Sequence, residues 1–466
     1  MPADLTRASA AELAKLYGAG KASPREAMVA ILARAERLNP VLNVFTRIDH
    51  DAAMTAARAS ERRWKRGKPL SPIDGVPVSI KELVKTRDWP LTMGSKLTDK
   101  TPATEDAPAV ARLREAGAII FAQSTSPEFG HKGVTDSPLN GITRNPWKLD
   151  RTPGGSSGGA GAAVAAGLGP LAIGTDGGGS VRIPASFNGL VGLKATFGRI
   201  PAWPPSMVGD LANTGPMART ALDCALMMNA IARPDSRDPY QLPPDDTDYT
   251  QRLTLRPKSL KVALVMKMGN HPLDREVATL VRNAAKTFEA MGCVVEEVKA
   301  PVDFALASKT FLVHWFSAMQ RLMRLFPESR HAEFDPSLMM QAQAAKAYTA
   351  LDVADAQAAR REIAYAWTQL TNRYDLLLTP TVAVAPFDVG RNYPDDANGK
   401  PNMMWSPYTA TFNLSRQPAA TVPCGLSRAG LPIGLQIVSG HYRDALVLAA
   451  AARFSREQPL GLAPIE

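Results

Sequence analysis

The order of apolar and polar residues changes along the chain, from helical spacing near the amino terminus to short apolar segments farther on. Ser23 and Glu26 have the spacing of a capping box, and the apolar residues that follow recur every three or four positions up to Pro40, where we expect the helix to end. A second helix is predicted over residues 51–65. We therefore expect residues 1–66 to form a helical layer that covers the rest of the protein.

Short apolar segments then alternate with helical ones, which is typical of an α/β sheet with helices on its faces. The predicted strands cover residues 75–83, 118–124, 170–176, 190–196, 259–266 and 293–298, and the predicted helices cover residues 106–117, 158–169 and 274–291. The same alternation returns after residue 374. Neither an internal repeat nor a Ser/Gly-rich linker divides the sequence, so we predict a single domain over residues 1–466.

Between residues 300 and 370 the chain is rich in Met, aromatic and Ala residues at helical spacing. Apolar faces of this kind usually pack on a core, so a helical layer is one interpretation. Met and aromatic side chains also adapt to apolar ligands, so the alternative is that part of this segment lines a substrate pocket.

Composition argues against several classes of protein. With 45% hydrophobic and 21% charged residues the chain has the composition of an ordinary globular protein. Its net charge of +10 is spread along the sequence without a basic, aromatic-rich stripe, so nucleic acid is not an expected partner. The three cysteines are far apart and no signal peptide is recognised, so we expect a cytoplasmic protein without a cysteine metal site. The uncharged segment 152–175 contains Pro153 and Pro170 among many Gly and Ala residues, which favours a buried segment over a membrane span.

Two glycine clusters that contain serines, residues 154–159 and 177–180, lie close together in the sequence. A phosphate-binding loop needs a Lys after its glycines, and a dinucleotide site needs a third Gly where this chain has Val164, so we expect no nucleotide cofactor. The first cluster also matches the Gly-x-Ser-x-Gly pattern of a nucleophile elbow, for which only His441 is suitably placed as a catalytic base. A His-based triad is therefore a weakly supported alternative.

A serine nucleophile that is activated by lysine needs features that this sequence provides. Ser180 follows Gly177–Gly179, whose amides no side chain covers, as stabilisation of an oxyanion requires. Lys81 follows a short apolar run, where loss of water would lower its pKa and leave a neutral base. Ser156 and Ser157 lie in the other glycine cluster, and either hydroxyl could carry a proton between the two.

Long segments of the chain are similar to one known family. The segments PGGSSGGAGAAVAAGLGPLAIGTDGGGSVRIPASFNGLVGLKAT (residues 153–196) and DGVPVSIKEL (residues 74–83) resemble the amidase signature family, and STSPEFG, TRNPW and LPIGLQIV add to the resemblance. This family is characterised by a Ser–cisSer–Lys triad. The resemblance implies the amidase-signature fold, an α/β architecture in which helices cover both faces of a central mixed, twisted sheet, with the catalytic core within residues 67–230.

The resemblance also assigns roles to individual residues. It implies that Ser180 is the nucleophile, that Ser156 is the relay serine after a cis peptide bond with Gly155, and that Lys81 is the base. It further implies an oxyanion hole that is made by the amides of Gly177, Gly178, Gly179 and Ser180. A supporting hydrogen-bond network is implied for Ser157, Asp176 and Arg182. One departure from the family is Glu82, at a position where Asp is frequent.

The activity implied by the resemblance is amide hydrolysis to an acid and ammonia or an amine through an acyl-enzyme. The apolar segments 301–367 and 403–405 favour a small hydrophobic or aryl amide as the substrate. His131 is a candidate substrate-binding residue, with a buried and fully hydrogen-bonded histidine as the alternative. The second functional hypothesis is the glutaminase (A-type) subunit of a tRNA-dependent amidotransferase, and a non-catalytic binding protein is disfavoured because all three triad positions are filled. A homodimer is compatible with these expectations, and no membrane, metal or cofactor is expected.

Overall fold

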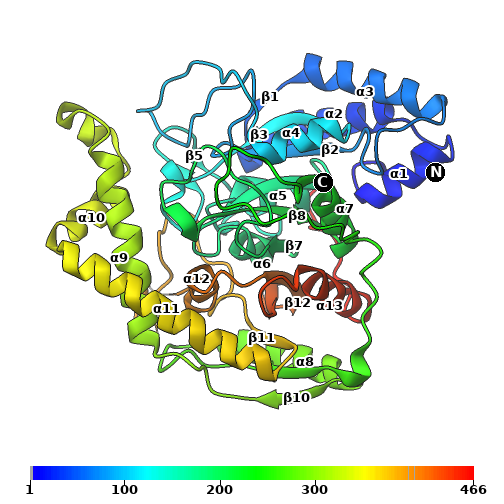
Figure 1. Ribbon diagram of the computed structural model, residues 1–466. Helices are drawn as coiled ribbons and strands as arrows, with labels where there is room; N and C mark the ends of the chain where they lie inside the picture. Colours follow the sequence, from blue (N-terminus) through cyan, green and yellow to red (C-terminus); the bar gives the residue numbers. More distant parts are fainter. Residues whose placement is uncertain (1–3, 397, 404) are drawn as a thin grey trace.

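The computed structural model describes residues 4–396, 398–403 and 405–466 (Figure 1). Within them, eleven strands form one sheet. Across the sheet they follow the order β1 (Phe45–Ile48), β3 (Ile119–Ser124), β2 (Pro77–Lys81), β6 (Leu171–Asp176), β8 (Asn213–Ala218), β7 (Val191–Lys194), β12 (Ala419–Leu426), β13 (Pro432–Val438), β11 (Leu376–Pro380), β9 (Lys261–Leu264) and β10 (Val294–Glu297). β2 is parallel to β3 and β6, and β9 is parallel to β10 and β11, whereas the other neighbours are antiparallel. The sheet is therefore mixed, and β4 (Asp136–Ser137) and β5 (Gly141–Ile142) form a small separate hairpin.

The helices lie on both faces of this sheet. They are α1 (Ala10–Gly18), α2 (Pro24–Leu42), α3 (His50–Lys65), α4 (Pro108–Glu115), α5 (Gly158–Ala165), α6 (Arg182–Asn188), α7 (Ala221–Ile231), α8 (Arg275–Ala290), α9 (Phe304–Met323), α10 (Pro336–Ala344), α11 (Ala350–Arg373), α12 (Pro407–Leu414) and α13 (Asp444–Glu457). Alternate residues of one strand enter different cores, because successive side chains of a strand point to opposite faces. Ile120 of β3 belongs to the core that also contains residues of α4, α7, α8 and α13, whereas its neighbours Ile119 and Phe121 belong to a second core with residues of α2, α3 and α5. The expected arrangement, with helices on both faces of a mixed sheet, is confirmed.

Several elements differ from the sequence-based expectation. α2 does not end before Pro40 but continues to Leu42, and Asn43 then ends it in the left-handed conformation with φ of 52°. Pro40 is tolerated because it lies in the last turn, where its missing N–H removes only one helical hydrogen bond. β8 was not predicted because its sequence, NTGPMA, shows no alternation of apolar and polar residues and contains Pro216.

The segment between residues 300 and 370 is helical, and its helices α9, α10 and α11 lie together at one side of the molecule (Figure 1). Their apolar residues, among them Met319, Leu338 and Trp367, form a core with Leu377 of β11. Trp315 of α9 lines a cavity as well. Most apolar side chains of this segment thus pack in a helical core, and Trp315 lies at a cavity, whose role as a substrate pocket stays a prediction.

The glycine-rich segment is buried, as its lack of charge suggested. Every residue of α5 is buried, and this helix packs beside β6 and α6. None of the helices in the described part of the chain is long and apolar enough to cross a membrane. Small side chains in α5 allow β2 and β6 to bring their carboxyl ends close to the helix.

Candidate active site

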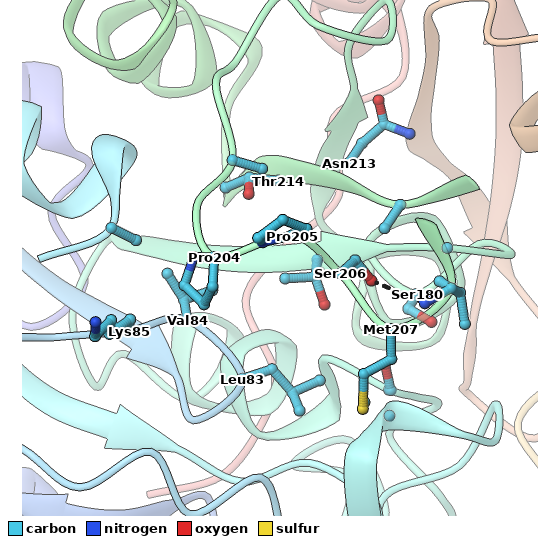
Figure 2. Close-up of a pocket in the computed structure, with 18 of the residues that line it drawn as sticks. Leu83, Val84, Lys85, Ser180, Pro204, Pro205, Ser206, Met207, Asn213 and Thr214 are labelled. Atoms are coloured by element: carbon cyan, nitrogen blue, oxygen red, sulfur yellow. Dashed lines mark hydrogen bonds between the residues drawn. The ribbon is translucent and has the colours of Figure 1, made fainter. Parts of the chain in front are cut away.

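A cavity opens at the carboxyl ends of the neighbouring parallel strands β2 and β6. Figure 2 shows residues that line it, among them Leu83, Val84 and Ser180, together with Pro204–Met207 from the loop before β8. Ser156 lines the same cavity as Ser180. The two serines thus meet at one space, although they come from different glycine clusters.

Lys81, the last residue of β2, is fully buried beneath this cavity. Its Nζ lies 2.6 Å from Oγ of Ser156, 2.9 Å from Oγ of Ser157 and 2.9 Å from Oγ1 of Thr175. The structure therefore brings together Lys81 and both serines of the first cluster. Thr175, which the sequence reasoning did not single out, completes a group of three hydroxyls around one amine.

Burial lowers the pKa of Lys81 to about 7, although the carboxylates of Asp176 and Glu82 act in the opposite direction. An ordinary lysine is almost fully protonated at neutral pH, because its pKa is close to 10.4. In this site a large fraction of the side chain is neutral at pH 7. A neutral amine has a lone pair and can accept a proton.

The hydrogen bonds around Ser157 restrict where the protons lie. Its hydroxyl donates to the Thr175 carbonyl at 3.1 Å and accepts the Thr175 N–H at 3.2 Å. Because its single proton is already used, the Ser157 hydroxyl can only accept a hydrogen bond from Lys81. When the second N–H of a neutral Lys81 is directed to the Thr175 hydroxyl, the lone pair faces Ser156.

Ser156 is held in a tight backbone turn. The peptide bond between Gly155 and Ser156 is cis, and Ser156 is 2% exposed. A Cβ at Gly155 would lie 2.4 Å from the carbonyl oxygen of Val134, so this position has no room for a side chain. The next residue, Ser157, donates its N–H to the carbonyl of Ser180 at 3.2 Å, which joins the two glycine clusters.

Ser180 lies in the loop between β6 and α6 and is 7% exposed. Of the three glycines expected to form an oxyanion hole, Gly177 lines the cavity. Gly179 departs from the expectation, because its N–H donates to Oδ1 of Asp176 at 2.8 Å and is therefore already occupied. Its φ of 127° nevertheless requires glycine.

Asp176 and Arg182 form a fully buried ion pair behind this loop. Two nitrogens of Arg182 donate to the two carboxylate oxygens, each at 2.9 Å. Burial alone would raise the pKa of Asp176, but the Arg182 guanidinium and a hydrogen bond from Asn413 lower it well below its usual range. Arg182 also donates to Gln436 at 2.7 Å, so the network ties the loop of Ser180 to α12 and β13. This supports the structural role expected of both residues.

His131 does not line the cavity and is 2% exposed. Its Nε2 lies 2.6 Å from Oγ of Ser337, and its Nδ1 lies 2.7 Å from the Glu128 carbonyl. Burial lowers its pKa to about 4, so the ring is neutral at pH 7. The structure thus corresponds to the alternative for this residue, a buried histidine with its ring nitrogens satisfied. Its backbone carbonyl helps to position a residue that lines the cavity, because it accepts a hydrogen bond from the indole of Trp315 at 3.2 Å.

Other candidates lie away from the cavity. His441, the base required by a His-based triad, has its Nε2 2.8 Å from the Ser415 carbonyl. Trp405 is buried and stacks on Phe187, whereas its neighbour Met404 lies outside the described residues. Among the residues that the structure describes, no group of three His, Cys, Asp or Glu could hold a metal ion.

Sequence reasoning missed most of the cavity wall. Met93, Phe129 and the loop 201–208 line the cavity, and their positions in the sequence are far from both glycine clusters. Thr175 had a usable signal, since it precedes Asp176 at the end of a predicted strand and next to the second cluster. The loop 201–208 had none, because its Pro-rich sequence is typical of any surface turn.

Comparisons with known proteins agree with the fold. The family model for amidases matches residues 26–448. The chain is 37% identical to an acylamidase of Rhodococcus erythropolis over an alignment of 461 residues. This alignment covers 97% of this chain and 95% of that protein. The chain is 34% identical over 478 residues to the A-type subunit of the glutamyl-tRNA(Gln) amidotransferase of Myxococcus xanthus, with 97% and 98% covered.

Solved structures of similar proteins have the same architecture. A bacterial aryl acylamidase of the amidase signature family superposes with a TM-score of 0.90 at 32% identity, covering 97% of this chain and 96% of that one. The 6-aminohexanoate cyclic dimer hydrolase superposes with a TM-score of 0.89 at 30% identity, covering 99% of each chain. Fold and relatives together define a hydrolase that acts on amide C–N bonds. The chain belongs to the amidase signature family.

Proposed function

We propose that this protein hydrolyses a small, uncharged hydrophobic or aryl amide through an acyl-enzyme on Ser180, with Ser156 as proton relay and Lys81 as base. The observation that carries the proposal is the buried amine of Lys81, 2.6 Å from Oγ of Ser156. Ser156 and Ser180 line one cavity, which supports a proton transfer from the nucleophile through Ser156 to the base.

The first step transfers two protons and forms one bond. Ser180 gives its proton to Ser156, Ser156 gives its own proton to neutral Lys81, and the Ser180 Oγ attacks the carbonyl carbon of the amide. The negative charge that develops on the carbonyl oxygen needs N–H donors, and the amides of Gly177, Gly178 and Ser180 are our candidates. Gly179 is left out because Asp176 already accepts its N–H. Loss of one such donor typically costs about a hundredfold to a thousandfold in rate.

The second half returns the protons. Lys81 gives its extra proton back through Ser156 to the nitrogen of the leaving group, the C–N bond breaks, and ammonia or an amine departs. Water then attacks the acyl-enzyme with the same relay as base, and Ser180 is restored. Lys81 must be neutral to begin the cycle, so activity is expected to rise with pH through about 7.

The lining of the cavity supports an uncharged substrate. Of its residues within the described part of the chain, only Lys85 is charged, and the Lys85 ammonium lies 3.0 Å from a carboxylate oxygen of Glu105. A free amino acid such as glutamine would bring an ammonium and a carboxylate, and burying each charge without a partner is costly. This cost disfavours glutamine as the substrate. The glutaminase subunit of an amidotransferase, a role that one group of relatives represents, is therefore the second candidate.

Assays of the purified chain alone test this proposal. We expect ammonia from benzamide and hexanamide, and aniline from acetanilide, with little turnover of glutamine. Ser180→Ala, Ser156→Ala and Lys81→Ala should each reduce kcat/KM by at least about a thousandfold. Ser186→Ala is a matched control, because Ser186 is also buried but its hydroxyl has no hydrogen-bond partner among the described residues. Hydroxylamine added to the reaction should intercept the acyl-enzyme and give a hydroxamic acid.

Two results would reject the proposal. Undiminished amide hydrolysis by Ser180→Ala would exclude Ser180 as the nucleophile. Turnover of glutamine that requires added partner proteins, with no turnover of simple amides, would favour the amidotransferase role instead.

A further inference from the structure

Two aromatic residues of α9 lie against the glycines that precede Ser180. Phe311 and Trp315 are one helical turn apart, and their rings stack with centroids 5.2 Å apart and planes inclined by 25°. A Cβ at Gly178 would lie 2.7 Å from Cζ of Phe311, and a Cβ at Gly177 would lie 3.0 Å from Cζ3 of Trp315. The aromatic pair, Phe311 and Trp315, therefore packs directly on bare backbone.

This contact gives a reason for glycine that the backbone conformation does not. Gly179 has a φ of 127°, which favours glycine whatever its neighbours are. Gly177 and Gly178 lie outside the left-handed region, so their backbone could carry a side chain without strain. The space that such a side chain would need is taken by the aromatic pair, and also by Val208 at Gly177.

Trp315 is fixed in place from several directions. Its indole N–H donates to the backbone carbonyl of His131 at 3.2 Å, and its ring stacks on Phe311. It is 9% exposed and lines the same cavity as Ser180. A flat ring held from two sides thus lines the cavity that contains Ser180, together with apolar side chains such as Leu83 and Phe129.

We propose that Trp315, held by Phe311, is a specificity-determining residue that selects amides carrying a planar aromatic group next to the scissile bond. This inference rests on the function proposed above and narrows it to one substrate class. The aromatic group can stand on either side of the bond, in an aryl acyl group or in an aryl amine. Ring stacking favours such a group because offset or edge contacts between aromatic rings contribute beyond the buried area alone.

The test compares substrates that differ in planarity but hardly in size. Benzamide is paired with cyclohexanecarboxamide for the acyl side, and acetanilide is paired with N-cyclohexylacetamide for the amine side. We expect the wild-type protein to prefer the aromatic member of at least one pair, and Trp315→Leu to reduce kcat/KM for that member by about 2- to 12-fold. The saturated member should change by less than about twofold. The pair that responds identifies the side of the bond that contacts Trp315.

Phe316→Leu is the matched control, because Phe316 is an aromatic neighbour on α9 that packs on the helical core and is absent from the cavity lining described above. It should leave the preference for the aromatic substrate unchanged. Equal losses on both members of each pair in Trp315→Leu, with Phe316→Leu unaffected, would overturn the inference. So would a wild-type protein that hydrolyses both members equally well, a result that leaves amide hydrolysis by Ser180 intact.

A second experiment tests the contact with the glycine backbone. Gly178→Ala keeps the N–H but places a methyl group against Phe311, so we expect lower kcat/KM. Gly178→Ala combined with Phe311→Leu should recover at least part of that loss, because the shorter side chain makes room. A double variant that is no more active than Gly178→Ala would contradict the proposed packing.

Discussion

Thr175→Val provides the sharpest test of the role assigned to Lys81. Valine has nearly the shape of threonine, so the change removes little more than the hydroxyl whose oxygen lies 2.9 Å from Nζ of Lys81. The lysine cation has three N–H donors, and the structure supplies three hydroxyl oxygens for them. Neutral Lys81 has only two N–H donors and therefore needs one acceptor fewer. The substitution consequently destabilises the cation more than the neutral amine.

The size of the effect follows from ordinary hydrogen-bond strengths. A hydrogen bond to a charged group contributes about 1.5–3 kcal/mol, and one between neutral groups about 0.5–1.5 kcal/mol, so the differential loss is about 1 kcal/mol. Since about 1.4 kcal/mol corresponds to one pKa unit, the pKa of Lys81 should fall by about 0.7, from about 7 to about 6.3. The neutral form is the active one, so kcat/KM declines as the pH falls through this pKa. At pH 6 the wild-type protein should then keep roughly a tenth of its plateau activity and Thr175→Val roughly a third.

The measurement is kcat/KM for one amide between pH 5 and 9, with each profile normalised to its own plateau. Thr214→Val is the control, because Thr214 lies opposite Thr175 across β6 and β8 and lines the same cavity, but is not one of the three hydroxyls around Lys81. Its profile should coincide with that of the wild-type protein. An acid limb that moves upward in Thr175→Val, or moves equally in both variants, would refute the assignment of this limb to Lys81.

Three further changes have outcomes that the structure fixes. The first change is Lys81→Met. Lys81 is protonated below about pH 10.5 in the unfolded chain but only below about pH 7 in the folded protein, so the penalty that its burial imposes on wild-type stability falls by about 3 kcal/mol between pH 8 and 10.5. The free energy of unfolding of Lys81→Met minus that of wild type should therefore fall by this amount in urea titrations, and a pH-independent difference would contradict the buried lysine. Asp176→Asn leaves Arg182 as a buried cation without its carboxylate and should cost about 3–5 kcal/mol of stability, measured in the same way; a loss below about 1 kcal/mol would show that the pair is not buried as described. Gly155→Ala would place its methyl group 2.4 Å from the Val134 carbonyl oxygen and should lower both the melting temperature and kcat/KM, whereas Gly67→Ala, at a glycine with φ of 66° and no other atom within 4 Å of the added methyl group, probes the cost of backbone strain alone.

The strands that carry the site were predictable from sequence, because their apolar runs are continuous. Residues 75–83 and 170–176 were expected to be strands, and β2 and β6 lie within them. Both strands are almost entirely buried, which is why most of their residues are apolar. β8, which lies next to β6, could not be predicted in this way, since it contains Gly215 and Pro216, two residue types that are uncommon inside strands.

The chemical residues were also accessible to sequence reasoning, whereas their surroundings were not. Lys81, Ser156 and Ser157 were singled out, and the structure brings them into contact. The acceptor to which a backbone N–H donates cannot be inferred from the sequence. The hydrogen bond from the Gly179 N–H to the Asp176 carboxylate is therefore apparent only in the structure. Trp315 illustrates the same limit for the cavity wall, because its helical spacing indicates a buried side chain without saying which space it faces.

A second buried lysine shows why the hydroxyl cluster, and not the perturbed pKa, favours Lys81 as the proposed base. Lys194 of β7 is as fully buried as Lys81, and burial together with the nearby Arg182 also lowers its pKa to about 7. Its Nζ, however, donates to the backbone carbonyl of Ala195 at 3.1 Å, and it is not among the lining residues of the cavity that the structure describes. A carbonyl has no proton to give, so a neutral Lys194 has no donor from which it could take one there, whereas Lys81 has the hydroxyl of Ser156 within 2.6 Å. Two lysines with the same titration behaviour therefore differ in chemistry, because only Lys81 is connected through a hydroxyl to the cavity that contains Ser180.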